Sequence, residues 1–177
     1  MRRIPTIVSA IALAAIAAHA AASTTAAPLM DQRGVHFTFD DLRGHPTVLT
    51  FISAHCTDAC PLIEGQIAQA AAHERSVHGR LRFVTLSLDP QRDSIADLRR
   101  IAGAFDADPT YWRLARATPE RTRELMQIFG VVAARDGDGY ETSHTTLLYL
   151  LDRSGRYAGS VLPSTHLISQ LAGAESL

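Results

Sequence analysis

The two cysteines of the chain, Cys56 and Cys60, are the residues whose type and spacing best suit chemistry. Thiolates act as nucleophiles, as redox partners and as ligands for soft metals. The pair could therefore be a disulfide, a reactive thiol with its resolving partner, or part of a metal site. Residues at i and i+4 on a helix share a face, but their sulfurs lie further apart than those of an i, i+3 pair. The wider spacing leaves room for an ion between them.

The donor set available to such an ion limits the choice of metal. Two thiolates alone do not complete a tetrahedral structural zinc site, which needs four protein ligands. Cu(I) accepts fewer ligands and prefers sulfur, so two thiolates and one imidazole suit copper. A lone histidine is more often structural than ligating, so spacing alone leaves the third ligand open. The candidate histidines beyond residue 22 are His36, His45, His55, His73, His78, His144 and His166.

The first 22 residues are organised like a secretory signal. Arg2 and Arg3 precede an uncharged apolar run at 7–18, and small residues at 18–22 could be cut by a signal peptidase. The alternative is an uncleaved membrane anchor, because 4–22 is almost long enough to span a bilayer. We therefore expect an exported protein, in the periplasm or at the outer face of the cytoplasmic membrane, where disulfides persist.

Composition excludes several functional classes. The chain has 177 residues, a formal net charge of −1 and 46% hydrophobic residues, which is the composition of one globular domain. This charge balance gives no attraction for nucleic acid, and a membrane contact is expected only through an N-terminal anchor. All 17 basic residues are arginine, which excludes a catalytic lysine. The expected organisation is a signal or anchor at 1–22, a linker at 23–34 and a single domain at 35–177.

Hydrophobic patterning predicts alternating strands and helices after residue 34. Strands are expected at 35–39, 47–52, 81–88, 111–114, 145–152 and 157–162, and helices at 61–72, 95–105, 119–129 and after Ser164. The single helix between 47–52 and 81–88 makes those strands parallel. This order resembles the thioredoxin-like fold, an α/β class with a central mixed sheet flanked by helices, here with an N-terminal β extension. In that fold the active cysteines occupy the first strand-to-helix turn, where Cys56 and Cys60 fall.

The same likeness gives the loop around His144 a role. In thioredoxin-type oxidoreductases this loop faces the cysteines and contains a cis-proline that shields them from metals. The corresponding residues here are TSHT at 142–145, without a proline. Histidine in its place favours metal ligation.

Three motifs, in register, resemble the Sco/SenC family of copper-binding thioredoxin-like proteins. CTDACP at 56–61 is similar to the family's C-x-x-x-C-P, SLDPQRDS at 87–94 to its S-x-D-P-x-R-D-T, and HTTLLYLLDRSG at 144–155 to its histidine strand and turn. The likeness extends over about 37–171. It departs from the family at Thr57, where a proline commonly follows the first cysteine, and at Ser143, where an aspartate commonly precedes the histidine.

The resemblance implies that Cys56, Cys60 and His144 bind one copper per chain, as Cu(I), Cu(II) or both. It further implies a metallochaperone that delivers copper to a subunit of cytochrome oxidase, or to another copper protein, during assembly of the oxidase copper centre. Asp58 and Asp89 could lie behind the ligands and orient them or tune their charge. The alternative for Asp89 is a cap on the turn and the following helix, and for Asp58 a solvated loop position.

Two enzymatic functions compete with the chaperone. A thiol-disulfide oxidoreductase could reduce cysteines of the oxidase subunit or of another exported protein; Cys56 and Cys60 would then be catalytic, and a thiol reductant would be a partner. A peroxiredoxin-like peroxidase needs Ser or Thr three residues before the reactive cysteine, which Ser53 supplies, but the upstream proline of such sites is missing. Whether the protein is an enzyme therefore stays open at this level.

Overall fold

The computed structural model of the chain describes residues 28–56, 59–139 and 141–177. The expected signal or anchor at 1–22 and the acidic residue Asp58 lie outside this part. Within the described ranges, no helix combines the length and the apolar character needed to cross a bilayer.

A seven-stranded mixed sheet forms the centre of the domain, in the order β2-β1-β5-β4-β3-β8-β9. Neighbours β3, β4 and β5 are parallel, and the other pairs are antiparallel. The mixed sheet and its N-terminal β extension confirm the predicted fold class. The strands of this sheet are β1 (Leu29–Asp31), β2 (His36–Phe37), β3 (Thr47–Ile52), β4 (Arg82–Ser87), β5 (Trp112–Arg116), β8 (Leu148–Leu151) and β9 (Tyr157–Val161).

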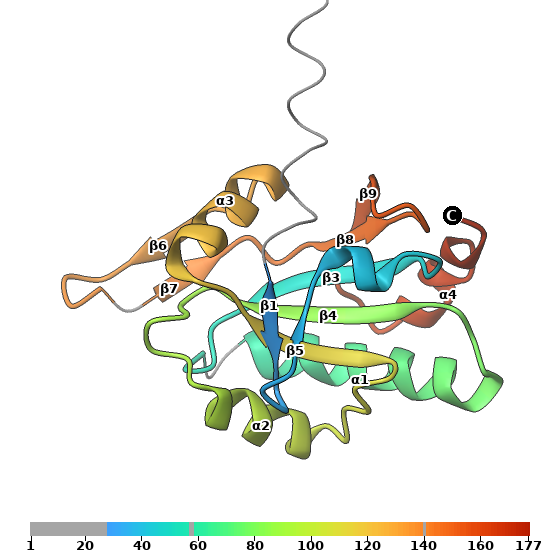
Figure 1. The fold of residues 1–177 in the computed structure, drawn as a ribbon, viewed down its shortest axis with the longest axis horizontal. Coiled ribbons are helices and arrows are strands. Elements are labelled where there is room, and N and C mark those ends of the chain that lie inside the picture. Colours follow the sequence, from blue (N-terminus) through green and yellow to red (C-terminus); the bar gives the residue numbers. More distant parts are fainter. Residues whose placement is uncertain (1–27, 57–58, 140) are drawn as a thin grey trace, which may run out of the picture.

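Helices cover both faces of this sheet (Figure 1). α1 and α2 lie on one face, where their apolar side chains share a core with those of α4, and α3 packs on the other face. All six residues of β3 are buried, as expected for a strand covered on both sides. The helices are α1 (Ala59–Val77), α2 (Ile95–Ala104), α3 (Pro119–Phe129) and α4 (Leu167–Leu171), with 3₁₀ turns η1 (Phe39–Leu42) and η2 (Ala174–Ser176).

Local sequence explains where the central helices begin and end. Ser94 caps α2 in a reciprocal capping box with Asp97. The Thr118 hydroxyl accepts from the Arg121 amide at the start of α3, and Gly130 ends that helix with φ of 65°. Ser94 therefore marks the end of the loop that follows β4, and Thr118 marks the end of the loop that follows β5.

Several elements differ from the sequence-based expectation. The short strand β1 lies inside the range 23–34 expected as a linker. α1 begins at Ala59, two residues before the expected start, and runs to Val77. A separate two-stranded sheet, β6 (Ala133–Arg135) and β7 (Glu141–His144), was not expected, and it projects from the domain in Figure 1.

Candidate metal centre

The cysteine turn joins the end of β3 to the start of α1. Cys56 is half-buried in the loop, and Cys60 is buried in the first turn of α1. The Cys56 amide donates to the Ser53 carbonyl over 3.1 Å, so the loop folds back on itself just before the first thiol. Both cysteines are free thiols. The predicted placement of the pair on this strand-to-helix turn is therefore confirmed by the fold.

The thiol of Cys60 is held in its protonated form. Burial raises its pKa, and so does the hydrogen bond that the thiol donates to the Cys56 sulfur, against a lowering contribution from the Ser53 backbone. The loss of hydration on burial thus outweighs any stabilisation of the thiolate by the N-terminus of α1. A metal bound at this pair must displace the proton from Cys60.

His144 approaches the same strand end from the β6–β7 sheet. It is the last residue of β7, half-buried, and pairs with Ala133 of β6. Its Nε2 lies 3.1 Å from the carbonyl oxygen of Phe51, which is in β3 five residues before Cys56. A carbonyl oxygen only accepts, so Nε2 carries the proton and the lone pair of the neutral ring is on Nδ1.

The predicted ligands share one edge of the fold without forming a finished site. Within 28–56, 59–139 and 141–177, no three histidine, cysteine or acidic side chains converge closely enough to hold a metal ion. The two thiols lie on the same turn, and His144 contacts the strand that leads to them. As a donor set, two thiols and an imidazole fit copper. The assembled ligand set of Cys56, Cys60 and His144 stays a prediction.

Asp89, predicted as a possible second-layer acid, pairs with two arginines. Its Oδ2 lies 2.9 Å from Arg92 Nη1 and 2.8 Å from Arg135 Nη1. Burial acts to raise the pKa of this carboxyl, but the two guanidinium groups lower it overall, so it stays ionised. Arg135 belongs to β6, and Asp89 therefore contacts the sheet that carries His144.

Asp93 is a buried residue whose contact with the cysteine turn sequence reasoning missed. It is fully buried and accepts from the Ser87 hydroxyl over 2.6 Å and from the Ala54 amide over 3.2 Å. Burial raises its pKa in spite of these bonds. Its place in the SLDPQRDS motif, after a buried strand, was the available signal. The structure gives the α2 cap to Ser94 and uses Asp93 to hold the cysteine turn.

Glu64 is a second residue that sequence reasoning missed. It follows Cys60 by one helical turn and is 1% exposed. Its Oε2 lies 3.5 Å from the Thr85 hydroxyl, and Oε1 has no hydrogen-bond partner among the described residues. Burial raises the pKa of this carboxyl to about 8. The signal was its position between Ile63 and Ile67 on the apolar face of the helix.

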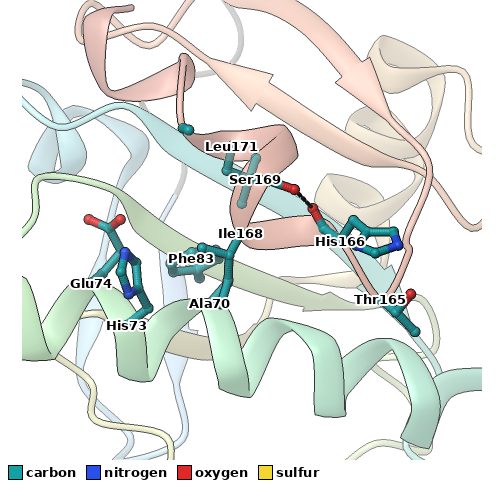
Figure 2. A pocket seen from close by; sticks show the side chains of 10 residues that line it. Ala70, His73, Glu74, Phe83, Thr165, His166, Ile168, Ser169 and Leu171 are labelled. Carbon is teal, nitrogen blue, oxygen red and sulfur yellow. Dashed lines mark hydrogen bonds between the residues drawn. The ribbon is translucent and has the colours of Figure 1, made fainter.

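A cavity between α1 and α4 lies apart from this centre. Its volume is about 470 Å³, and His73 and Glu74 line it from α1 while His166 lies across it on the α4 side (Figure 2). The side chains of His73 and His166 are exposed, and they do not converge on a common point. The cavity contains no cysteine, so it does not compete with the edge that carries Cys56, Cys60 and His144.

Comparison with known proteins identifies the family. The sequence profile described as SCO1/SenC matches residues 18–175. The chain belongs to the SCO1/SenC family. An SCO2-like protein of Rickettsia prowazekii (strain Madrid E) is 29% identical over 136 residues, covering 73% of this chain and 64% of the relative. This chain thus aligns with less than two thirds of that relative's length.

Solved structures of the family share the fold. Bradyrhizobium japonicum ScoI, determined with copper bound, is 27% identical, with a TM-score of 0.69 over 85% of this chain and 96% of that one. A SCO1/SenC family lipoprotein from Bacillus anthracis is 22% identical, with a TM-score of 0.72 over 81% and 89% of the two chains. The predicted thioredoxin-like architecture and the predicted family are both confirmed.

Proposed function

We propose that this protein is an extracytoplasmic copper metallochaperone that serves assembly of the copper centre of cytochrome oxidase. The observation that carries the proposal is the pair of free thiols on the β3–α1 turn, with His144 bonded to the end of the same strand. Family membership supports it, as does the copper bound in the Bradyrhizobium japonicum relative. The proposed ligands are Cys56, Cys60 and His144, with one copper per chain.

The chemistry follows from the three side chains. Cys56 and Cys60 supply two soft donors after loss of their protons, and His144 supplies a neutral nitrogen. Half-burial of Cys56 and His144 leaves this edge open to an acceptor protein. The proposed acceptor is the copper-binding subunit of cytochrome oxidase or another copper protein, and export through the signal at 1–22 would place the chain beside it.

Metal analysis of reduced protein tests this function. We expect one copper per chain, and we expect His144→Ala to weaken binding by at least about tenfold, the lower limit for losing even a residue that only supports a ligand. The matched control is His36→Ala, because His36 is an exposed histidine on β2. Equal copper affinity in the His144 and His36 variants would remove His144 from the site.

A second candidate function is thiol-disulfide exchange with a cysteine-containing client. The presence of both free thiols on one turn favours it, and Cys56 contributes to raising the pKa of the Cys60 thiol. In this reaction the two thiols are oxidised to a disulfide, the client disulfide is reduced, and an external thiol reductant restores the pair. Turnover of a disulfide substrate by copper-free protein would support the oxidoreductase, and its absence together with copper uptake would support the chaperone.

A further inference from the structure

The segment that leaves β4 after Ser87 and enters α2 runs between the two halves of the proposed metal centre. The Leu88 amide donates to the Ile52 carbonyl over 2.7 Å, at the end of β3. The Arg92 and Asp93 amides both donate to the Asp89 carbonyl, over 3.0 and 2.8 Å. The segment is therefore a tight, internally bonded turn that is fixed to the strand leading to the cysteines.

One side of this turn holds the cysteine loop. Both carboxylate oxygens of Asp93 lie 3.2 Å from the Ala54 amide, two residues before Cys56. The Ser87 hydroxyl donates to the same carboxylate over 2.6 Å and accepts from the Asp89 amide over 3.1 Å. Because Asp93 is fully buried, these bonds act in a medium of low polarity, where they restrict the loop strongly.

The other side of the turn holds the histidine hairpin. Asp89 binds the guanidinium groups of Arg92 and Arg135, and both of these groups also donate to the Gly139 carbonyl, over 3.0 and 2.9 Å. Arg92 reaches the Asp138 carbonyl as well, over 2.9 Å. We call Asp89, Arg92 and Arg135 together the clamp. Gly139 lies in the loop between β6 and β7, so the clamp contacts the hairpin at the end far from His144.

We propose that the 87–93 segment is a two-armed brace in which Asp93 positions the cysteine turn and Asp89, with Arg92 and Arg135, positions the hairpin that presents His144. The copper readout of this inference rests on the proposed function, but the brace itself does not. Charge-assisted bonds from two arginines to one largely buried carboxylate are strong and directional. The arms meet within seven residues, so one rigid turn sets the separation of the thiols and the imidazole.

Arg135→Gln removes the bonds of Arg135 to Asp89 and to the Gly139 carbonyl, which belong to the arm that holds the hairpin. Arg123→Gln is its matched control. Arg123 undergoes the same change of side chain on α3, where it forms an exposed ion pair with Glu120. We expect Arg135→Gln to speed amide hydrogen exchange about tenfold within 133–144, with no change in β3 and β4, because the clamp is local. Arg123→Gln should leave both regions unchanged. Equal exchange in the two variants, or a uniform rise throughout Arg135→Gln, would overturn the brace.

Copper spectroscopy separates positioning from general loss of stability. In Arg135→Gln and in Asp89→Asn we expect about tenfold weaker copper binding and loss of the imidazole nitrogen coupling in the Cu(II) resonance spectrum. The thiolate-to-copper absorption should persist. Asp93→Asn should do the reverse, shifting the thiolate absorption while hairpin exchange stays at the wild-type rate. Loss of both signatures together in every variant would refute separate arms.

The two kinds of readout also keep the proposals distinguishable. If wild-type protein binds no copper, the proposed function fails, while faster exchange confined to the hairpin in Arg135→Gln still supports the brace. If copper binds through His144 and the hairpin exchanges at the same rate in all variants, the function stands and the brace is wrong.

Discussion

The cysteine turn and the histidine hairpin reach the same edge of the fold by different physical means. The cysteine turn connects a fully buried strand to a long helix, and its thiol Cys60 is itself part of the core. The hairpin lies outside the main sheet and is held by arginine side chains and backbone carbonyls. The cysteine turn thus has packed core residues beneath it in addition to its bonds to Asp93, whereas the hairpin is held by a small set of polar contacts that single substitutions can remove.

The largest effect is expected on the packed side. Cys56→Ser should lower Cu(I) affinity by more than about a hundredfold, beyond the range for a residue that only supports a ligand, because a hydroxyl replaces an anionic soft donor. Titration with a competing chelator of known affinity measures the loss. A Cys56→Ser loss no greater than that of His144→Ala would show that the hairpin, not the turn, dominates binding.

Oxidation provides a reversible version of the same test. A Cys56–Cys60 disulfide should abolish Cu(I) binding, since neither sulfur remains available as a thiolate, and reduction should restore it. Mass spectrometry verifies the disulfide before copper is measured. Copper retained by fully oxidised protein would argue against thiolate ligation.

Glu64 tests how a buried carboxyl group beside the cysteine turn affects the pH dependence of stability. Its folded pKa of about 8 exceeds the value of 4.5 for a free carboxyl, so only the folded state keeps the proton between these values. Stability should therefore fall as pH rises from about 4.5 to 8, by a few kcal/mol at roughly 1.4 kcal/mol per unit. Glu64→Gln should reduce this slope in urea unfolding.

The matched control for this measurement is Glu120→Gln, because Glu120 is exposed on α3. It should keep the wild-type pH slope. A Glu64→Gln protein whose stability falls with pH as steeply as that of Glu120→Gln would mean that Glu64 is ionised in the folded state.

The smallest effect is expected at the far end of the hairpin. Gly139 has φ of 81°, and a Cβ there would lie 3.1 Å from Arg92 Nη2. Gly155 has nearly the same φ, 80°, with no atom within 4 Å of such a Cβ. Alanine at either position costs about 1–2 kcal/mol of backbone strain. Only Gly139→Ala should also speed amide hydrogen exchange in β6 and β7. Equal exchange rates in the Gly139→Ala and Gly155→Ala variants would show that the clamp does not depend on the conformation of this loop.

The same contrast explains what the sequence could predict. β3 and α3 were predicted at their observed bounds, because a run of buried β-branched residues and a capped amphipathic helix are local signals. From its motif, Asp89 was predicted either to support the ligands or to cap the turn, but its arginine partner on β6 is 46 residues away. No local pattern reveals such a pairing, so its contact with the hairpin could not be foreseen.

The missed or misplaced elements are those that lack a clear hydrophobic pattern and depend on particular side-chain contacts. β6 has three residues that are largely exposed, which gives no hydrophobic alternation to read. β1 has three residues, and its buried Asp31 is neutralised by Arg33 in the following turn. The last helix was expected to be capped by Ser164, but it starts at Leu167, and the Ser164 hydroxyl instead accepts from the His166 amide. Each error arose where side chains, not periodicity, decide the structure.

The hydrogen bond between His144 and Phe51 has a consequence for how the proposed protein would release copper. The ring is tethered to the protein through Nε2, while the lone pair that could bind a metal is on Nδ1. In the proposed chaperone, copper would bind and leave at Nδ1 while Nε2 keeps its hydrogen bond to Phe51. The imidazole would then have the same orientation before and after delivery of the ion.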